Sequence, residues 1–305
     1  LYGIPNIDDD DQNGQRDWDD NLAQTDPSLE DDLTTLLFPS SVLSQLRKNQ
    51  EFRIRLLSDN IRIYRDGELK LNSDGDNVRV DVFNDENDIK YHIEWPDYLA
   101  SGELEVVWIE NKNSGQEELF VWPIQLQAAP LLINHHLQPA EQAYAMEYRG
   151  SGGNMDFING FADVLAEQFT SYSVNQYGFD VWIQDEIEFG YLTHPEARID
   201  VVIDSIRDRE LDELPEEELE GPNMMVETWG QGWATSQDSF GNLEATPPIT
   251  VDGTHYPFGR IYYGRWNSEG VNQELRSFLD SQSVQNPLEM DITFLCVGHV
   301  DEYIS

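Results

Sequence analysis

The stretch Glu51-Phe52-Arg53-Ile54-Arg55-Leu56 alternates polar and apolar residues with a period of two. Because successive side chains of a β-strand point to opposite faces, this alternation predicts a strand with one buried and one wet face. Turn residues separate further stretches of the same kind, so the sequence predicts an antiparallel β-sandwich over residues 1–127. The further stretches are residues 61–64, 78–82, 104–109 and 119–122.

The character of the sequence changes after Gln127-Ala128-Ala129-Pro130, which we interpret as a linker. Helices are predicted over residues 154–168, with an inward apolar stripe that includes Phe161 and Val164, and over residues 271–282. The Glu-rich residues 211–220 are predicted to form a solvated loop. Helices mixed with strands indicate an α/β domain over residues 128–305. Its predicted strands are residues 179–187, 199–203, 260–263 and 292–300.

The composition is strongly acidic, with a formal net charge of −41 over 305 residues. Such a surface repels phosphate groups, which argues against nucleic acid and anionic membranes as partners. It suits cations, either metal ions or Arg-rich peptides, although a solvated surface like that of salt-adapted proteins is an equally good explanation of the bulk charge. No run of 18 apolar residues exists, so the sequence predicts no membrane span.

An acidic segment near the N-terminus has the spacing of a 12-residue calcium loop. Side-chain oxygens stand at loop positions 1, 3, 5, 9 and 12, and Gly14 stands at position 6, where the turn needs a permissive backbone. A flexible acidic tail has a similar composition, so that alternative stays open. The predicted ligands are Asp9, Asp11, Asn13, Asp17 and Asp20.

The segment Trp182-Ile183-Gln184-Asp185-Glu186-Ile187-Glu188 is also rich in oxygen ligands. On a strand, Gln184, Glu186 and Glu188 share one face and Asp185 points the other way. Three such side chains beside buried apolar residues are unfavourable unless a cation neutralises them. The alternative is an edge strand with a wet acidic face.

A third segment, Val297-Gly298-His299-Val300-Asp301-Glu302, places His299 and Asp301 two residues apart. On a strand they share a face, and an imidazole beside a carboxylate can act as a general acid and base. A second carboxylate facing this pair would clamp a planar guanidinium. A structural histidine is the plainer interpretation, and zinc is disfavoured because no third His or Cys stands at ligand spacing.

Together these segments resemble the protein-arginine deiminase family. The matching blocks are residues 182–191 (WIQDEIEFGY), 204–209 (DSIRDR), 238–244 (DSFGNLE), 256–260 (YPFGR) and 297–302 (VGHVDE). The similarity runs through residues 128–305 and more weakly through 1–127. It implies an α+β multidomain protein, in which a calcium-binding immunoglobulin-like sandwich precedes an incomplete α/β propeller (pentein) built from ββαβ modules.

The resemblance implies calcium-dependent hydrolysis of peptidyl-arginine to peptidyl-citrulline and ammonia through a covalent cysteine intermediate. Asp185 and Asp301 match the carboxylates that hold the guanidinium, and His299 matches the general acid and base. Trp182 matches the wall beside the substrate stem, and Arg209 the contact to the substrate backbone. Gln184, Glu188, Phe240, Leu243 and Glu244 match one Ca²⁺ site, and Glu186, Asp204, Ser205 and Asp208 match a second.

The family's nucleophilic cysteine lies beyond the part of the family that these residues match. Cys296 stands in an apolar run and, on a strand, would face away from His299, so we interpret it as a core cysteine. We therefore expect a piece of a longer chain that is inactive alone.

Two alternatives stay open, a non-enzymatic calcium-binding module and a metal-dependent hydrolase. The family precedent favours the cytoplasm and arginine-containing proteins or peptides as substrates, and it allows a homodimer. The acidic, cysteine-poor start would also fit secretion.

Overall fold

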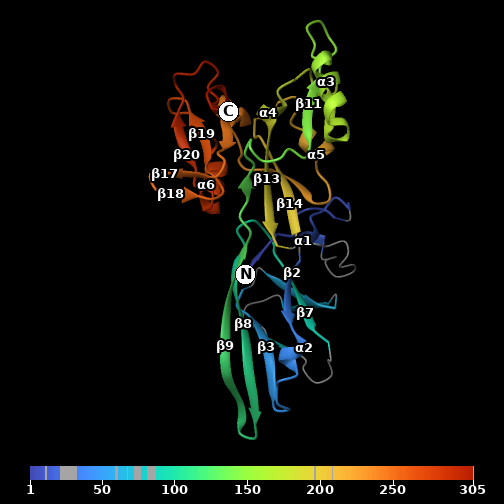
Figure 1. The fold of residues 1–305 in the computed structure, drawn as a ribbon, viewed down its shortest axis with the longest axis vertical. Coiled ribbons are helices and arrows are strands. Elements are labelled where there is room, and N and C mark those ends of the chain that lie inside the picture. Colours follow the sequence, from blue (N-terminus) through green and yellow to red (C-terminus); the bar gives the residue numbers. More distant parts are fainter. Residues whose placement is uncertain are drawn as a thin grey trace. The chain divides into compact units, whose positions relative to one another are not determined.

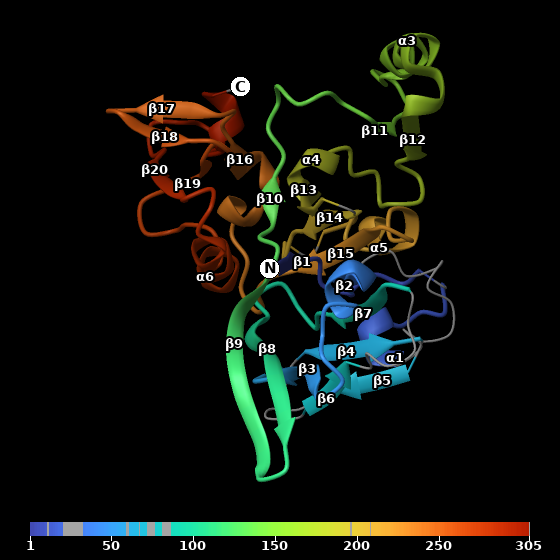
Figure 2. The same cartoon turned by 60° about the horizontal axis from the view of Figure 1, so that its bottom comes forward.

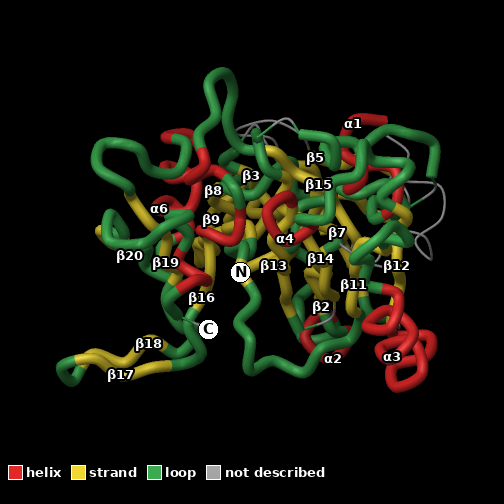
Figure 3. The backbone as a smooth tube through the Cα atoms, turned by 90° about the horizontal axis from the view of Figure 1, so that it is seen from above, coloured by secondary structure: helices red, strands yellow, loops and turns green. Residues whose placement is uncertain are grey.

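The computed structural model describes residues 1–10, 12–20, 33–58, 61–66, 68–71, 77–80, 87–195, 197–207 and 209–304. Strands predominate and the helices are few and short, as the colours of Figure 3 show. The chain divides into two compact units. Unit 1 comprises Leu1–Pro130, Leu192–Ile199 and Gly221–Asn223, and unit 2 comprises Leu131–Tyr191, Asp200–Glu220 and Met224–Ser305.

Unit 1 contains two β-sheets and the short helices α1 (Asp17–Asp20) and α2 (Ser40–Leu43). Neighbouring strands are antiparallel, except that β1 pairs parallel to β9, and β8 and β9 form the long hairpin seen in Figure 1. In the first sheet the order is β1 (Tyr2–Gly3), β9 (Gly115–Ala128), β8 (Ser101–Lys112), β3 (Gln50–Leu56) and β6 (Asn77–Val80). In the second it is β2 (Thr34–Phe38), β7 (Ile89–Glu94), β4 (Arg62–Arg65) and β5 (Glu68–Leu71).

Both sheets of unit 1 contribute side chains to one hydrophobic core. Ile54 and Leu104 come from the first sheet and Ile63 and Ile93 from the second, and all four are fully buried. The alternation of residues 51–56 is the reason, because the apolar positions of β3 all turn to the core while Arg53 and Arg55 stay partly exposed. The five strands predicted for this region are confirmed, although residues 81 and 82 of the strand predicted over 78–82 lie outside the described residues. An immunoglobulin-like topology stays a prediction.

A succession of two strands, a helix and a strand occurs twice in the remaining chain. In each copy the strands on either side of the helix are parallel neighbours, β14 with β15 and β19 with β20. The first copy is β13 (Ile187–His194), β14 (Ala197–Asp204), α5 (Leu214–Glu218) and β15 (Met224–Thr228). The second is β16 (Leu243–Ala245), β19 (Ile261–Arg265), α6 (Gln273–Gln282) and β20 (Leu288–Asp291).

Other elements extend these two copies. Strand β10 (Leu132–Ile133) pairs antiparallel to β13, and the hairpin of β17 (Ile249–Val251) and β18 (Thr254–Tyr256) stands between β16 and β19 in the chain (Figure 2). The parallel pair β11 (Ala143–Glu147) and β12 (Phe169–Ser173) is joined through α3 (Met155–Leu165) and the 3₁₀ turn η1 (Ala166–Gln168). A closed propeller of such modules stays a prediction.

The predicted strand over residues 179–187 is wrong, because Ile183–Glu186 forms the short helix α4. The Asp180 side chain accepts a hydrogen bond from the Trp182 N–H, and the Asp185 N–H donates to the Trp182 carbonyl. These local bonds replace a strand ladder. The expectation that Gln184, Glu186 and Glu188 share one strand face therefore fails.

The predicted strand over residues 292–300 is also wrong. The Glu302 carboxylate accepts the backbone N–H groups of Gly298 and His299 and draws the chain into a turn that ends in the 3₁₀ helix η4 (Val300–Glu302). Gly298 has a φ of +93°, which only glycine adopts readily. Cys296 lies in this turn and is exposed, so its interpretation as a core cysteine is corrected.

The helices predicted over residues 154–168 and 271–282 are confirmed as α3 with η1 and as α6. The inward stripe of α3 is not, because Phe161 is 40% exposed and Val164 is 80% exposed. The predicted loop at 211–220 contains α5 instead. Leu211 and Leu214 are fully buried there, and that apolar burial outweighs the solvation of the acidic side chains around them.

Candidate active site

Three ionisable side chains converge beside Gly241 in unit 2. Asp185 comes from α4, His299 caps η4 and Asp301 lies within it, while Gly241 belongs to the 3₁₀ turn η3 (Phe240–Asn242). A β-carbon placed on Gly241 would lie 2.8 Å from Asp301 Oδ2, 3.0 Å from His299 Nδ1 and 3.2 Å from Asp185 Oδ1. Two carboxylates and an imidazole thus surround one small volume, although α4 and η4 are far apart in sequence.

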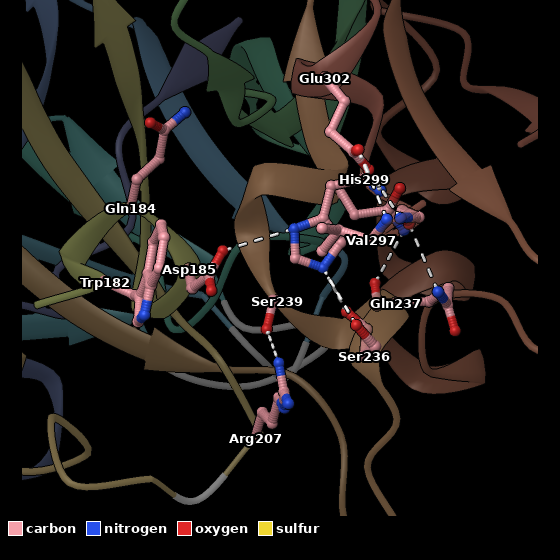
Figure 4. Close-up of polar contacts among 12 residues, drawn as sticks. Trp182, Gln184, Asp185, Arg207, Ser236, Gln237, Ser239, Val297, His299 and Glu302 are labelled. Carbon is pink, nitrogen blue, oxygen red and sulfur yellow. Dashed lines mark hydrogen bonds and ion pairs between the residues drawn. The ribbon is translucent and has the colours of Figure 1, made fainter. Parts of the chain in front are cut away.

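The His299 ring is held from both sides and is 5% exposed (Figure 4). Its Nε2 lies 2.9 Å from the Ser236 carbonyl oxygen and 3.2 Å from the Ser236 hydroxyl, and the shorter contact favours a hydrogen on Nε2 because a carbonyl can only accept. Its Nδ1 lies 3.5 Å from Asp185 Oδ1. Since Nε2 is hydrogen-bonded to Ser236, Nδ1 is the ring nitrogen that can exchange a proton with a group bound beside Gly241.

The two carboxylates of the site differ in accessibility. Asp301 is an exposed residue, yet its carboxylate is partly desolvated. This desolvation raises the pKa of Asp301, and the charge of Asp185 raises it further. The Asp185 side chain is 16% exposed. A cation placed between the two would relieve their repulsion.

A guanidinium already contacts this cluster. Arg209 donates through Nη1 to Asp185 Oδ2 at 3.1 Å and pairs through Nη2 with Asp180. Trp182, at the start of α4, is 62% exposed and presents an aromatic face to solvent. The site therefore combines carboxylates that accept guanidinium hydrogens with an apolar side chain nearby.

Glu186, which follows Asp185 in the sequence, forms a pair of buried carboxylates with Asp204. Glu186 is 1% and Asp204 5% exposed, and Glu186 Oε1 and Asp204 Oδ1 have no hydrogen-bond partner. Burial, and after it the charge of Asp204, raises the pKa of Glu186 to about 8. Burial raises the pKa of Asp204 to about 7. Both groups favour the neutral form unless positive charge is supplied.

Glu188 and Glu244 form a second carboxylate pair, in which both residues are half-buried. Burial, and after it repulsion from Glu244, raises the pKa of Glu188 well above its usual range. Burial, and after it Asp301, raises the pKa of Glu244 to about 7. Gln184 Nε2 lies 3.5 Å from Glu244 Oε1, so an amide and a carboxylate meet here.

The chain is similar to proteins of a known family. The family model for protein-arginine deiminase (PAD) matches residues 120–305. The chain belongs to the protein-arginine deiminase family. It is 32% identical to rat protein-arginine deiminase type-4 over 74% of this chain and 36% of that protein. It is 32% identical to human type-1 over 72% of the chain and 35% of that protein, and 35% identical to human type-4 over 60% and 28%. The chain thus spans about a third of the length of these deiminases.

The residues predicted for chemistry in this deiminase-family chain lie together: Asp185, His299 and Asp301 meet at Gly241, and Arg209 contacts Asp185. The predicted metal ligands are arranged in smaller groups. Ser205 donates its N–H to the Glu186 carbonyl and follows Asp204, while Phe240 and Leu243 are buried at η3 and β16. Asp208 lies outside the described residues. Among the residues described, no group of three or more His, Cys, Asp or Glu side chains is arranged so that it could hold a metal ion.

The predicted calcium loop of unit 1 folds back on its own backbone. Asp9 Oδ1 and Oδ2 accept the N–H groups of Asn13 and Gly14, and Asp17 Oδ2 accepts that of Asp10. Gly14 has a φ of +86°, as the loop pattern requires. Asp11 lies outside the described residues, and the side chain of Asp20 is not described either.

Sequence reasoning missed four residues that shape the site: Asp180, Ser236, Gly241 and Glu302. Gly241 stands in the quoted block 238–244, and a glycine in such a block can mark the close approach of another group. Asp180 stands three residues before α4 begins and accepts the N–H of the residue two positions on, which is an Asx turn. Nothing in the sequence points to Ser236, because its contact with His299 spans 63 residues.

Among the residues that the structure covers, no helix is both long and apolar enough to cross a membrane.

Proposed function

We propose that the full-length protein is a calcium-dependent deiminase that hydrolyses peptidyl-arginine in proteins or peptides to peptidyl-citrulline and ammonia. One observation supports this above all: Asp185 already accepts a guanidinium, that of Arg209, and Asp301 and His299 face the same small volume. The deiminases named above belong to the same family, so deimination of protein arginine, which their name states, is the reaction that we propose for the full-length protein.

In the proposed reaction Asp185 and Asp301 hold the substrate guanidinium through charge-assisted hydrogen bonds. A cysteine thiolate forms a bond to the guanidinium carbon, the C–N bond breaks, and ammonia leaves with a proton from His299 Nδ1. A water then gives one proton to His299, adds to the same carbon as hydroxide and expels the thiolate. The remaining hydroxyl proton passes to solvent, which yields the citrulline carbonyl. Trp182 lines the substrate stem and Arg209 contacts the substrate backbone.

We propose that the thiolate comes from outside these 305 residues. Cys296 is exposed in the turn before His299, whereas the reacting volume lies at Gly241 between Asp185, His299 and Asp301. A nucleophile there needs a side chain that enters this volume. The complete reaction is therefore a property of the full-length protein.

Calcium fits the buried acids by donor type, because Ca²⁺ prefers oxygen ligands alone. The partnerless oxygens of Glu186 and Asp204 support a cation there. When bound, Ca²⁺ would supply the positive charge that these carboxylates lack. We propose one site held by Glu186, Asp204, Ser205 and Asp208, and another held by Gln184, Glu188, Glu244 and the carbonyls of Phe240 and Leu243.

The remaining assignments complete the proposal. Residues 1–127 form an immunoglobulin-like domain whose loop binds Ca²⁺ through Asp9, Asp11, Asn13, Asp17 and Asp20. Residues 128–305 are the front of a pentein propeller, and the two ββαβ successions support this. The protein is proposed to act in the cytoplasm.

The test is citrulline formation from benzoyl-arginine amide by the full-length protein, with and without saturating Ca²⁺. Turnover is expected only with Ca²⁺, and Asp301→Asn should lower it by about a thousandfold while calcium binding, measured by calorimetry, stays close to wild type. Calcium binding without any citrulline would instead favour a non-enzymatic calcium-binding module.

A further inference from the structure

Asp180 has no part in the proposed chemistry, yet its side chain is only 6% exposed. A buried carboxylate is unfavourable unless donors satisfy it. Oδ1 of Asp180 accepts the Trp182 N–H at 2.9 Å, and Oδ2 pairs with Nη2 of Arg209. Arg209 uses Nη1 for Asp185. One guanidinium is thus shared between a buried carboxylate and the carboxylate of the proposed active site.

The turn that delivers Asp180 has an unfavourable backbone. Gly178 and Phe179 both have positive φ, +54° and +69°, and Phe179 is a bulky residue in a region that favours glycine. The Phe179 side chain is 64% exposed, so burial of its ring does not compensate. The Asp180 N–H nevertheless bonds to the Tyr177 carbonyl at 2.9 Å. Backbone strain of this kind is retained where the exact position of a side chain is needed.

The position matters because Arg209 competes with any bound guanidinium for Asp185. A guanidinium that gave both terminal nitrogens to Asp185 would neutralise it through a bidentate pair. Asp180 occupies Nη2, so Arg209 reaches only Oδ2 of Asp185. Oδ1 of Asp185 still faces Gly241 and His299.

We propose that Asp180 is a positioning residue, which holds Arg209 beside Asp185 and keeps Asp185 available to a substrate guanidinium. The inference rests on the proposed function. Asp180 also fixes the start of α4 through Trp182, so the carboxylate and the competing arginine are placed by the same side chain.

The experiment measures binding of butylguanidine to the full-length protein with calcium by calorimetry. Asp180→Asn keeps an acceptor for the Trp182 N–H but loses the charge that holds Arg209. Arg209 then pairs with Asp185, and affinity should fall about tenfold, the size of one charge-assisted hydrogen bond. Adding Arg209→Ala to Asp180→Asn should restore affinity to within about twofold of wild type, because the competitor is gone. Glu210→Gln, which removes a charge beside the Gly178 turn, is the matched control.

Unchanged affinity for butylguanidine in Asp180→Asn would overturn the inference. The inference would also be wrong if the double variant bound butylguanidine as weakly as Asp180→Asn alone. Should Asp180→Asn fail to fold, Arg209→Ala alone decides, since it must bind butylguanidine at least as well as wild type. Wild-type protein that makes no citrulline would overturn the proposed function and this inference with it. Citrulline formation by the wild type, together with wild-type binding in Asp180→Asn, overturns this inference alone.

Discussion

Two acidic regions of the molecule, both predicted to bind calcium, differ in how their carboxylates are hydrogen-bonded. In the loop of unit 1, Asp9 accepts backbone N–H groups from Asn13 at 2.9 Å and Gly14 at 2.6 Å. In unit 2, Glu186 Oε1 and Asp204 Oδ1 are buried without a hydrogen-bond partner. Backbone N–H groups satisfy the Asp9 carboxylate, whereas Glu186 and Asp204 need a proton or a cation.

Acidic composition alone therefore does not show whether a region requires a metal ion. A carboxylate that accepts two N–H groups keeps its charge at little cost. A buried carboxylate beside another buried carboxylate does not, which is why the pKa of Glu186 rises to about 8. Charge substitutions should therefore act strongly in unit 2 and weakly in the loop.

Among the substitutions that compare the two acidic regions, the largest effect is expected at the centre of the unit 2 site, from Gly241→Ala. The added carbon would lie within 3.2 Å of Asp301, His299 and Asp185 and occupy the volume proposed for the substrate guanidinium. Turnover of benzoyl-arginine amide by the full-length protein should fall by about a hundredfold or more. Gly160→Ala in α3 is the control, because a β-carbon there meets nothing within 4 Å. Equal turnover in both variants would show that Gly241 does not line the reacting volume.

Glu186→Gln should change the response to calcium next most strongly. Burial, and after it the charge of Asp204, raises the pKa of Glu186 to about 8, so near neutral pH folding must protonate this carboxylate. A neutral amide avoids that cost, so without divalent ions the melting temperature should rise by a few degrees. The same variant should lose most of the stabilisation that calcium gives to wild type. Exposed Glu167→Gln serves as the control and should respond as wild type does. Full calcium stabilisation of Glu186→Gln would remove Glu186 from the proposed site.

The pH dependence of stability follows from the same groups and is expected to be smaller. Folded Glu186 has a pKa of about 8 and Asp204 and Glu244 of about 7, whereas the unfolded carboxyls titrate near about 4. Between these limits the folded state binds more protons than the unfolded chain, so stability falls as pH rises through about 4 to 8. Scanning calorimetry without divalent ions should give a melting temperature a few degrees higher at about pH 5.5 than at about pH 8.5. Saturating Ca²⁺ should shrink that difference, and a difference of opposite sign would mean that these acids are not buried in the protein.

The sequence predicted these regions unevenly, for physical reasons. The alternation of residues 51–56 predicted β3, because burial of every second side chain is a property of the strand itself. The helix α4 and the turn before η4 could not be predicted in this way. They depend on single side chains, Asp180 and Glu302, that bond to nearby backbone and override the apolar pattern. The convergence of Asp185 and Asp301 is a tertiary contact, and only a family resemblance suggested it.

The smallest effect is expected in the loop of unit 1, from Asp9→Ala. The substitution leaves the N–H groups of Asn13 and Gly14 without their acceptor, but water can replace it at this exposed site. Unit 1 should lose about 1 kcal/mol of stability in urea unfolding, and Asp9→Asn, which keeps one acceptor oxygen, should lose less. The sign is the informative part, because in calcium-free protein Asp9→Ala should destabilise while Glu186→Gln stabilises. If Asp9→Ala raised the stability instead, the loop carboxylates would also be repelling one another, and the two acidic regions would be alike after all.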